Sequence, residues 1–166
     1  YENIDSSKCI IGDDSTLLVD GVNNKIVGAV DTASLTVSST NVAIGNSAGE
    51  TTQGVQAVSL GARAGQTTQG NNATAIGADA GNSSQGANAT AIGGGSAQVS
   101  QGEGAVAIGY LAGETTQGAS SVAIGKEAGL TSQGTESVAI GLLAGKLNQG
   151  SQTIAIGSEA GRDDQG

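Results

Sequence analysis

The chain has 166 residues and a formal net charge of −9 with only six basic residues, so it lacks the positive surface that nucleic acids and anionic membranes require. It contains no Phe, Trp, Met, Pro or His and only two Tyr, which excludes a conventional core of large side chains and every His-based catalytic or metal site. No stretch approaches the roughly 18 apolar residues of a membrane-spanning helix, so we expect no membrane insertion.

Residues 1–38 carry no repeat and are predicted to form a small β-rich cap or joining segment. Thr16–Val19 and Lys25–Val27 have the composition of two strands joined by a turn, and Leu35–Val37 that of a third. Such a cap would cover the open end of a repetitive sheet, which otherwise invites uncontrolled pairing. Cys9 is the single cysteine; we interpret it as a half-buried free thiol, with an interchain bridge as the alternative.

Residues 39–166 consist of eight tandem units of sixteen residues. The triplet Ala-Ile-Gly or a close relative ends at Gly45 and recurs with this spacing up to Gly157, and each unit closes with Gln-Gly. Such a fixed phase has no explanation in a helical or irregular domain. It predicts an all-β fold, a parallel β-solenoid or β-roll in which each unit is one coil. We number the unit from position 1, Ser39, to position 16, Gly54.

Positions 2–6 are expected to form a short strand, because residues 40–44 alternate in character and are rich in β-branched side chains. Coils stacked about 4.8 Å apart would align equivalent residues in ladders. We predict that positions 4 and 6 fill the interior, and that the alanines at position 5 face a neighbouring chain. The two predicted interior ranks are Val42, Val58, Thr74, Thr90, Val106, Val122, Val138 and Ile154, and Ile44, Leu60, Ile76, Ile92, Ile108, Ile124, Ile140 and Ile156.

The glutamines at position 15 are predicted to form a ladder of side-chain amides that hydrogen-bond from coil to coil, with ligand or ion binding as the alternative. The Ser/Thr-rich positions before them would form a second, more polar strand. A coil of this size encloses little and is marginally stable alone, so we expect a homotrimer. The ladder consists of Gln53, Gln69, Gln85, Gln101, Gln117, Gln133, Gln149 and Gln165.

No catalytic, cofactor or metal site is expected, and the chain is not predicted to be an enzyme. The pairs Asp13-Asp14 and Asp163-Asp164 lack the spacing of a calcium loop and are interpreted as solvated turn residues. The run Gly93-Gly94-Gly95 is followed by no lysine at the spacing of a phosphate loop. It is interpreted as an altered coil, in which Ala97 replaces a corner glycine.

The best candidate for a receptor or interchain contact is an apolar strip after the Ala-Ile-Gly triplet. Most units have small or charged residues there, but two units have Tyr110-Leu111 and Leu142-Leu143. These pairs are two coil spacings apart, so they would lie about 10 Å from each other on one edge. Such a strip on an acidic rod could contact a glycan, a protein receptor or another copy of the chain.

Units such as Ser121-Val122-Ala123-Ile124-Gly125 resemble the core of YadA-like head repeats, and the resemblance covers residues 39–166. That family forms left-handed parallel β-roll heads of trimeric autotransporter adhesins, so the resemblance implies a trimer with an adhesive role. The unit of that family is usually shorter than the sixteen residues found here. In its Ala-Gly and Gln-Gly corners this repeat is similar to those of fibre or surface proteins of large DNA viruses and phages.

The leading functional expectation is a homotrimeric fibre or spike segment on a virion surface that serves host attachment. A bacterial adhesin head at the cell surface is an alternative, which predicts a secretion signal upstream and a stalk and anchor downstream. Ice binding by a hydroxyl face is a third possibility. The hydroxyl residues at position 13, which include Thr67 and Thr115, form a row that other residue types interrupt. Adjacent strand positions are expected to face opposite ways, so a double row of threonines is not expected.

Overall fold

The computed structural model describes residues 10–11, 17–20, 25–27 and 41–165, and the chain divides into two units, Tyr1–Val37 and Ser38–Gly166. In the first unit, β1 (Ile10–Ile11), β2 (Leu17–Asp20) and β3 (Lys25–Val27) form an antiparallel sheet in that order. The two predicted strands are confirmed as β2 and β3, whereas β1 was not predicted. The predicted strand at residues 35–37, Cys9 and the acidic pair at residues 13–14 lie outside the described residues.

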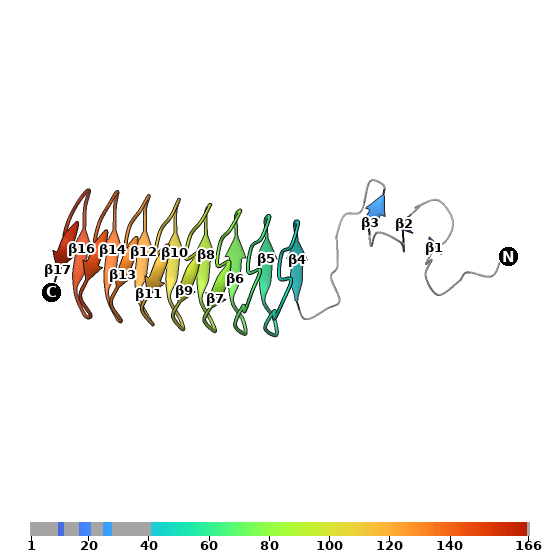
Figure 1. Ribbon diagram of the computed structural model, residues 1–166, viewed down its shortest axis with the longest axis horizontal. Coiled ribbons are helices and arrows are strands. Elements are labelled where there is room, and N and C mark those ends of the chain that lie inside the picture. Colours follow the sequence, from blue (N-terminus) through green and yellow to red (C-terminus); the bar gives the residue numbers. More distant parts are fainter. Residues whose placement is uncertain (1–9, 12–16, 21–24, 28–40, 166) are drawn as a thin grey trace. The chain divides into compact units, whose positions relative to one another are not determined.

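The second unit is a parallel β-solenoid, and no helix occurs among the described residues (Figure 1), so the predicted all-β class and parallel β-solenoid are confirmed. The homotrimer and the capping role of the first unit stay predictions. One strand per coil, at positions 4–6, joins an eight-stranded parallel sheet. Its strands are β4 (Val42–Ile44), β5 (Val58–Leu60), β6 (Thr74–Ile76), β8 (Thr90–Ile92), β10 (Val106–Ile108), β12 (Val122–Ile124), β14 (Val138–Ile140) and β16 (Ile154–Ile156).

Positions 13–15 form the predicted second strand, and six of these strands pair in a second parallel sheet. In the first coils the same alignment continues as isolated bridges from Gln53 to Gln69 and from Gln69 to Gln85. The strands of this sheet are β7 (Ser83–Gln85), β9 (Val99–Gln101), β11 (Thr115–Gln117), β13 (Thr131–Gln133), β15 (Leu147–Gln149) and β17 (Asp163–Gln165).

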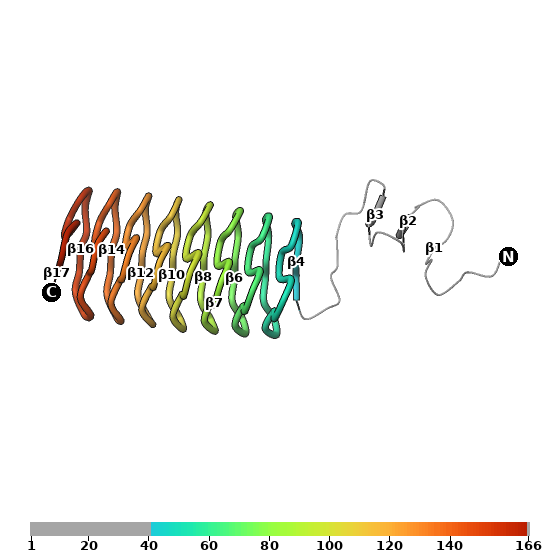
Figure 2. The backbone as a smooth tube through the Cα atoms, in the orientation of Figure 1, coloured from blue at the N-terminus to red at the C-terminus, as the bar shows by residue number. Residues whose placement is uncertain are grey.

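The coils stack in register, so that Ala107 pairs with Ala91 on one side and Ala123 on the other. Figure 2 shows the same backbone outline repeated from coil to coil. Glycine at position 7 permits this close stacking. Gly109 has a φ of 131°, and a Cβ placed on it would lie 2.6 Å from the carbonyl oxygen of Gly125. Any other residue type would collide with the next coil.

The interior of the solenoid holds small side chains and glutamines rather than branched apolar ones. The position 5 alanines from Ala75 to Ala139 are fully buried, whereas Ile44, Ile154 and Ile156 are 50%, 67% and 64% exposed. The predicted interior of positions 4 and 6, and the predicted contact of the alanine row with another chain, are therefore wrong. The reason is the thinness of the coil, in which a Cβ placed on Gly129 would lie 3.2 Å from the Cβ of Ala123.

Candidate interaction surfaces

The glutamine ladder lies inside the coil, and hydrogen bonds between side-chain amides join its members from Gln69 to Gln133. Gln117 is 2% exposed, and its Nε2 donates to the Val106 carbonyl at 2.8 Å and to Gln133 Oε1 at 3.2 Å. Its own Oε1 accepts from Gln101 Nε2 at 3.0 Å. Both donors and an acceptor of this buried amide are thus used within the chain, as burial of a polar group requires. From Gln69 to Gln133 these amides are occupied by structural bonds, whereas the buried Oε1 atoms of Gln149 and Gln165 accept no hydrogen bond from the described residues.

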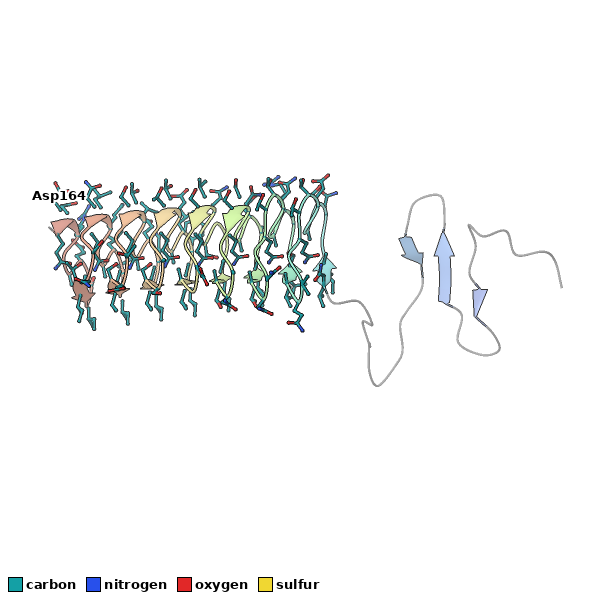
Figure 3. The ribbon with its side chains drawn as sticks, turned by 90° about the horizontal axis from the view of Figure 1, so that it is seen from below. Asp164 is labelled. Carbon is teal, nitrogen blue, oxygen red and sulfur yellow. The ribbon has the colours of Figure 1, made fainter. Side chains whose placement is uncertain are left out.

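The branched side chains at positions 4 and 6 form the outer surface of the eight-stranded sheet, which we call the apolar face. Ile108 and Ile124 are half-buried, and Leu60 is 42% exposed. In Figure 3 the side chains along the outer side of this sheet are largely carbon, especially toward the C-terminal coils. The ranks contain two polar members, Thr74 and Thr90. The two predicted ladders are therefore aligned in register, but they line the outside of the solenoid.

The outer surface of the six-stranded sheet, the polar face, carries positions 13 and 14. Thr116 is exposed beside half-buried Thr115, because position 14 has a positive φ in the coils from Ser84 onward, 55° at Thr116, that breaks the regular alternation of the strand. The expectation that adjacent positions face opposite ways is therefore wrong here. Figure 3 shows Asp164 pointing outward at the end of this face. Residues without a hydroxyl interrupt the rank at position 13, namely Val99, Leu147 and Asp163.

The predicted apolar strip lies in the turns that join the two sheets, along one edge of the solenoid. Tyr110 and Leu142 at position 8 are 57% and 46% exposed, whereas Leu111 and Leu143 at position 9 are half-buried. The side chain of Leu111 lies over Gly95 of the preceding coil. A Cβ placed on Gly95 would lie only 2.6 Å from Leu111 Cδ2. The two pairs share this edge, but a coil with charged residues separates them, so the apolar strip is not continuous.

The charged residues of this edge were not singled out as site residues from the sequence. The basic residues of the described solenoid all lie at positions 8, 9 and 12, which we call the mixed edge; they are Arg63, Lys126, Lys146 and Arg162. Sorting charges by repeat position would have found them. Hydrogen bonds confirm that positions 9 and 12 of neighbouring coils are adjacent, since Lys146 Nζ lies 2.9 Å from Glu127 Oε2.

Ion pairs neutralise most of the mixed edge. Arg63 forms two hydrogen bonds with Asp79, at 2.6 and 2.7 Å, which are the main reason that the pKa of the Asp79 carboxyl lies below its usual value. The pKa of Glu127 is likewise lowered, chiefly by the hydrogen bond from Lys146. Lys126 forms a weaker ion pair than Lys146 does, because its Nζ lies 3.6 Å from the same Glu127 carboxylate.

Within the described ranges, no helix has the length and apolar character to cross a membrane. No group of three or more His, Cys, Asp or Glu side chains gathers in that part of the chain. Comparisons with protein-family models, with curated proteins and with solved structures gave no match. The YadA-like resemblance therefore stays a prediction, and function is inferred from the surfaces described above.

Proposed function

We propose that this chain is a structural and adhesive segment of a fibre on a virion surface, in which copies associate through the apolar face and present their other surfaces to a host. The observation that carries this proposal is the position of the branched side chains. Ile, Val and Leu, interrupted only by Thr74 and Thr90, line one outer face over eight coils, while the interior of the described coils contains only small residues and glutamines.

The energetics favour covering the apolar face. Full burial of one Val, Leu or Ile stabilises a protein by about 1.5–3 kcal/mol, whereas a methyl group contributes only about 0.8 kcal/mol. The largest fully buried side chains of the described solenoid are glutamines and serines, so its interior supplies little hydrophobic free energy. Most of the hydrophobic free energy that this chain can gain comes from the branched side chains of the outer face, and it is gained only when another surface covers them. Contiguous apolar patches of this kind mark interaction sites.

A second copy of the chain has the same spacing of side chains as this face. Its ranks repeat once per coil, about every 4.8 Å, and an identical solenoid has the same repeat. The YadA-like resemblance implies three copies around a common axis. A stack of eight coils would give a shaft about 40 Å long. A bacterial adhesin head would use the same assembly, and the complete gene distinguishes the two by the presence of a secretion signal and a membrane anchor.

Sedimentation equilibrium tests the assembly. We expect the wild-type chain to have the mass of a trimer, and the double variant Ile108→Lys/Ile124→Lys to be monomeric because its charges would be buried in the interface. The control is Ser132→Lys on the polar face, which should remain trimeric. A monomeric wild type, or a double variant that assembles like the wild type, would contradict the proposal.

Ice binding is a second candidate, favoured by the finding that the adjacent hydroxyls of Thr67 and Thr68 are both exposed, in the coil that precedes the six-stranded sheet. Thermal hysteresis measurements would test it. This candidate requires activity in the wild type and its loss in Thr115→Lys, because a lysine would disrupt the surface of the polar face. Absence of thermal hysteresis in the wild type would eliminate this candidate.

A further inference from the structure

The mixed edge carries a line of three side chains whose chemistry differs from the rest of the solenoid. Position 8 is occupied in successive coils by Tyr110, Lys126 and Leu142. Tyr110 and Leu142 are 57% and 46% exposed, and the Lys126 side chain is 58% exposed. Because equivalent positions stack about 4.8 Å apart, an aromatic, a cationic and an aliphatic group follow one another within the reach of one small ligand.

The ring of Tyr110 stands beside a stretch of edge that is almost free of side chains. The preceding coil has Gly94 at position 8, and a Cβ placed there would lie 3.7 Å from Tyr110 Cδ2, which is ordinary van der Waals contact. The coil before that has Ala78 at this position. Nothing large therefore crowds the ring from this side. Tyr110 thus offers a rigid apolar surface with a polar tip, a combination enriched at binding interfaces.

Lys126 has hydrogen-bonding capacity to spare. Its one ion-pair partner among the described residues is Glu127, whose carboxylate is already held by Lys146 at the shorter distance of 2.9 Å, against 3.6 Å for Lys126. An ammonium group has three donors, and at this exposure they point largely to solvent. Elsewhere on the described solenoid, the carboxylates of Glu103 and Glu136 lie at positions 1 and 2 of the repeat, where no basic residue occurs. An anion is therefore best accommodated at Lys126.

We propose that Tyr110 and Lys126 bind a carboxylated sugar. The apolar face of the sugar ring lies against the tyrosine ring, and the carboxylate accepts charge-assisted hydrogen bonds from the Lys126 ammonium. Leu142, one coil further, contacts an apolar substituent. This inference rests on the proposed attachment function and names the chemical class of its receptor. One site contacts few atoms and binds weakly, but the copies in an oligomer present several sites at once and gain avidity.

Binding to immobilised sialyllactose and to oligogalacturonate tests this assignment, with lactose as the uncharged control. We expect the wild-type oligomer to bind at least one of the two acidic probes and not lactose. Lys126→Gln and Tyr110→Leu should each weaken that binding at least tenfold. The matched control is Arg63→Gln, which removes a positive charge from the same edge four coils away from Lys126 and should change binding less than twofold.

Four results would overturn the assignment: no binding of either acidic probe, equal binding of lactose, unchanged binding by Lys126→Gln, or an equal loss in Arg63→Gln. The mass of each sample is measured in parallel. Loss of binding by a variant that is still oligomeric concerns this site alone, whereas a monomeric wild type contradicts the fibre assembly.

Discussion

The two sides of the eight-stranded sheet differ in the size of their apolar side chains, and the larger side chains lie on the outer side rather than the inner one. The inner side consists of alanines such as Ala107, which are fully buried, and the outer side of branched residues such as Ile108, which are half-buried or exposed. In a domain with a thick core, the larger apolar side chains would take the inside. Here two short strands face each other across a space that admits only methyl groups and extended amides. The size of the side chain, and not its hydrophobicity, decides which side is buried.

The largest effect is expected from enlarging the interior. Ala107→Leu adds three carbons to a sealed space, so we expect a loss of about 3 kcal/mol of unfolding free energy or failure to fold. The matched control is Val106→Ile on the outer side, where Ile154 already occupies the equivalent position; it should change stability by less than about 1 kcal/mol. Chemical denaturation followed by circular dichroism measures both. Equal tolerance of the two substitutions would contradict the assignment of inside and outside.

Two glycine substitutions compare the effect on stability of a tightly stacked turn, at Gly109, with that of a less crowded turn, at Gly94. Gly109→Ala introduces a Cβ at a φ of 131° and against the Gly125 carbonyl, so we expect a loss of about 2–3 kcal/mol. Gly94→Ala places its Cβ in ordinary van der Waals contact, 3.7 Å from Tyr110 Cδ2, and should be neutral or stabilising by up to about 1 kcal/mol. The same denaturation experiment compares them. If Gly109→Ala were as stable as Gly94→Ala, the coils would not stack as described.

Removal of one ladder amide should have an intermediate effect. Gln117→Leu leaves Gln133 Oε1 and the Val106 carbonyl without their donor inside the coil, so we expect a loss of about 2 kcal/mol. The control is Gln66→Leu at position 12, a position that Leu130 occupies in another coil. It should change stability by less than about 0.5 kcal/mol. Urea denaturation at one protein concentration compares the variants, and an unaffected Gln117→Leu would refute a structural role for the ladder.

The smallest effect is expected from the Arg63–Asp79 pair on the mixed edge. The pKa of Asp79 is lowered in the folded chain, so its stabilising contribution is present above the ordinary Asp pKa of 3.8 and is lost as the pH falls through the lower folded value. Asp79→Asn should therefore cost less than about 1 kcal/mol at neutral pH. That difference should shrink in acid. A difference that grows on acidification would contradict the sign of this contribution.

The stacking of the solenoid was predictable because the sixteen-residue phase is strict, and the register follows from it. The inside of the coil was not predictable from alternation alone. Alternation places Val106 and Ile108 opposite Ala107, but it does not say which side is buried. That choice depends on the distance between the two sheets, which is a tertiary property. A preference for burying branched residues therefore selected the wrong side.

Two local features explain why the surfaces were only partly predicted. Left-handed backbone at position 14 exposes Thr116, and the sequence hints at it only through Asn148 and Asp164 at the equivalent position, since Asn and Asp tolerate this conformation. The sequence also does not reveal the hydrogen bond made by the one serine in the buried alanine row. Ser59 replaces an alanine, and its hydroxyl donates to Gln69 Oε1 at 2.8 Å, a role that the small size of serine does not reveal.

The dependence of the melting temperature on protein concentration tests the central claim most directly, namely that a coil filled with alanine and glutamine needs its outer apolar face covered by other copies. Association of folded chains stabilises them by mass action, so we predict a melting temperature that rises steadily as the concentration of wild-type protein is increased. A sharp transition at the same temperature over the whole concentration range, from a species with the mass of one chain, would contradict the claim.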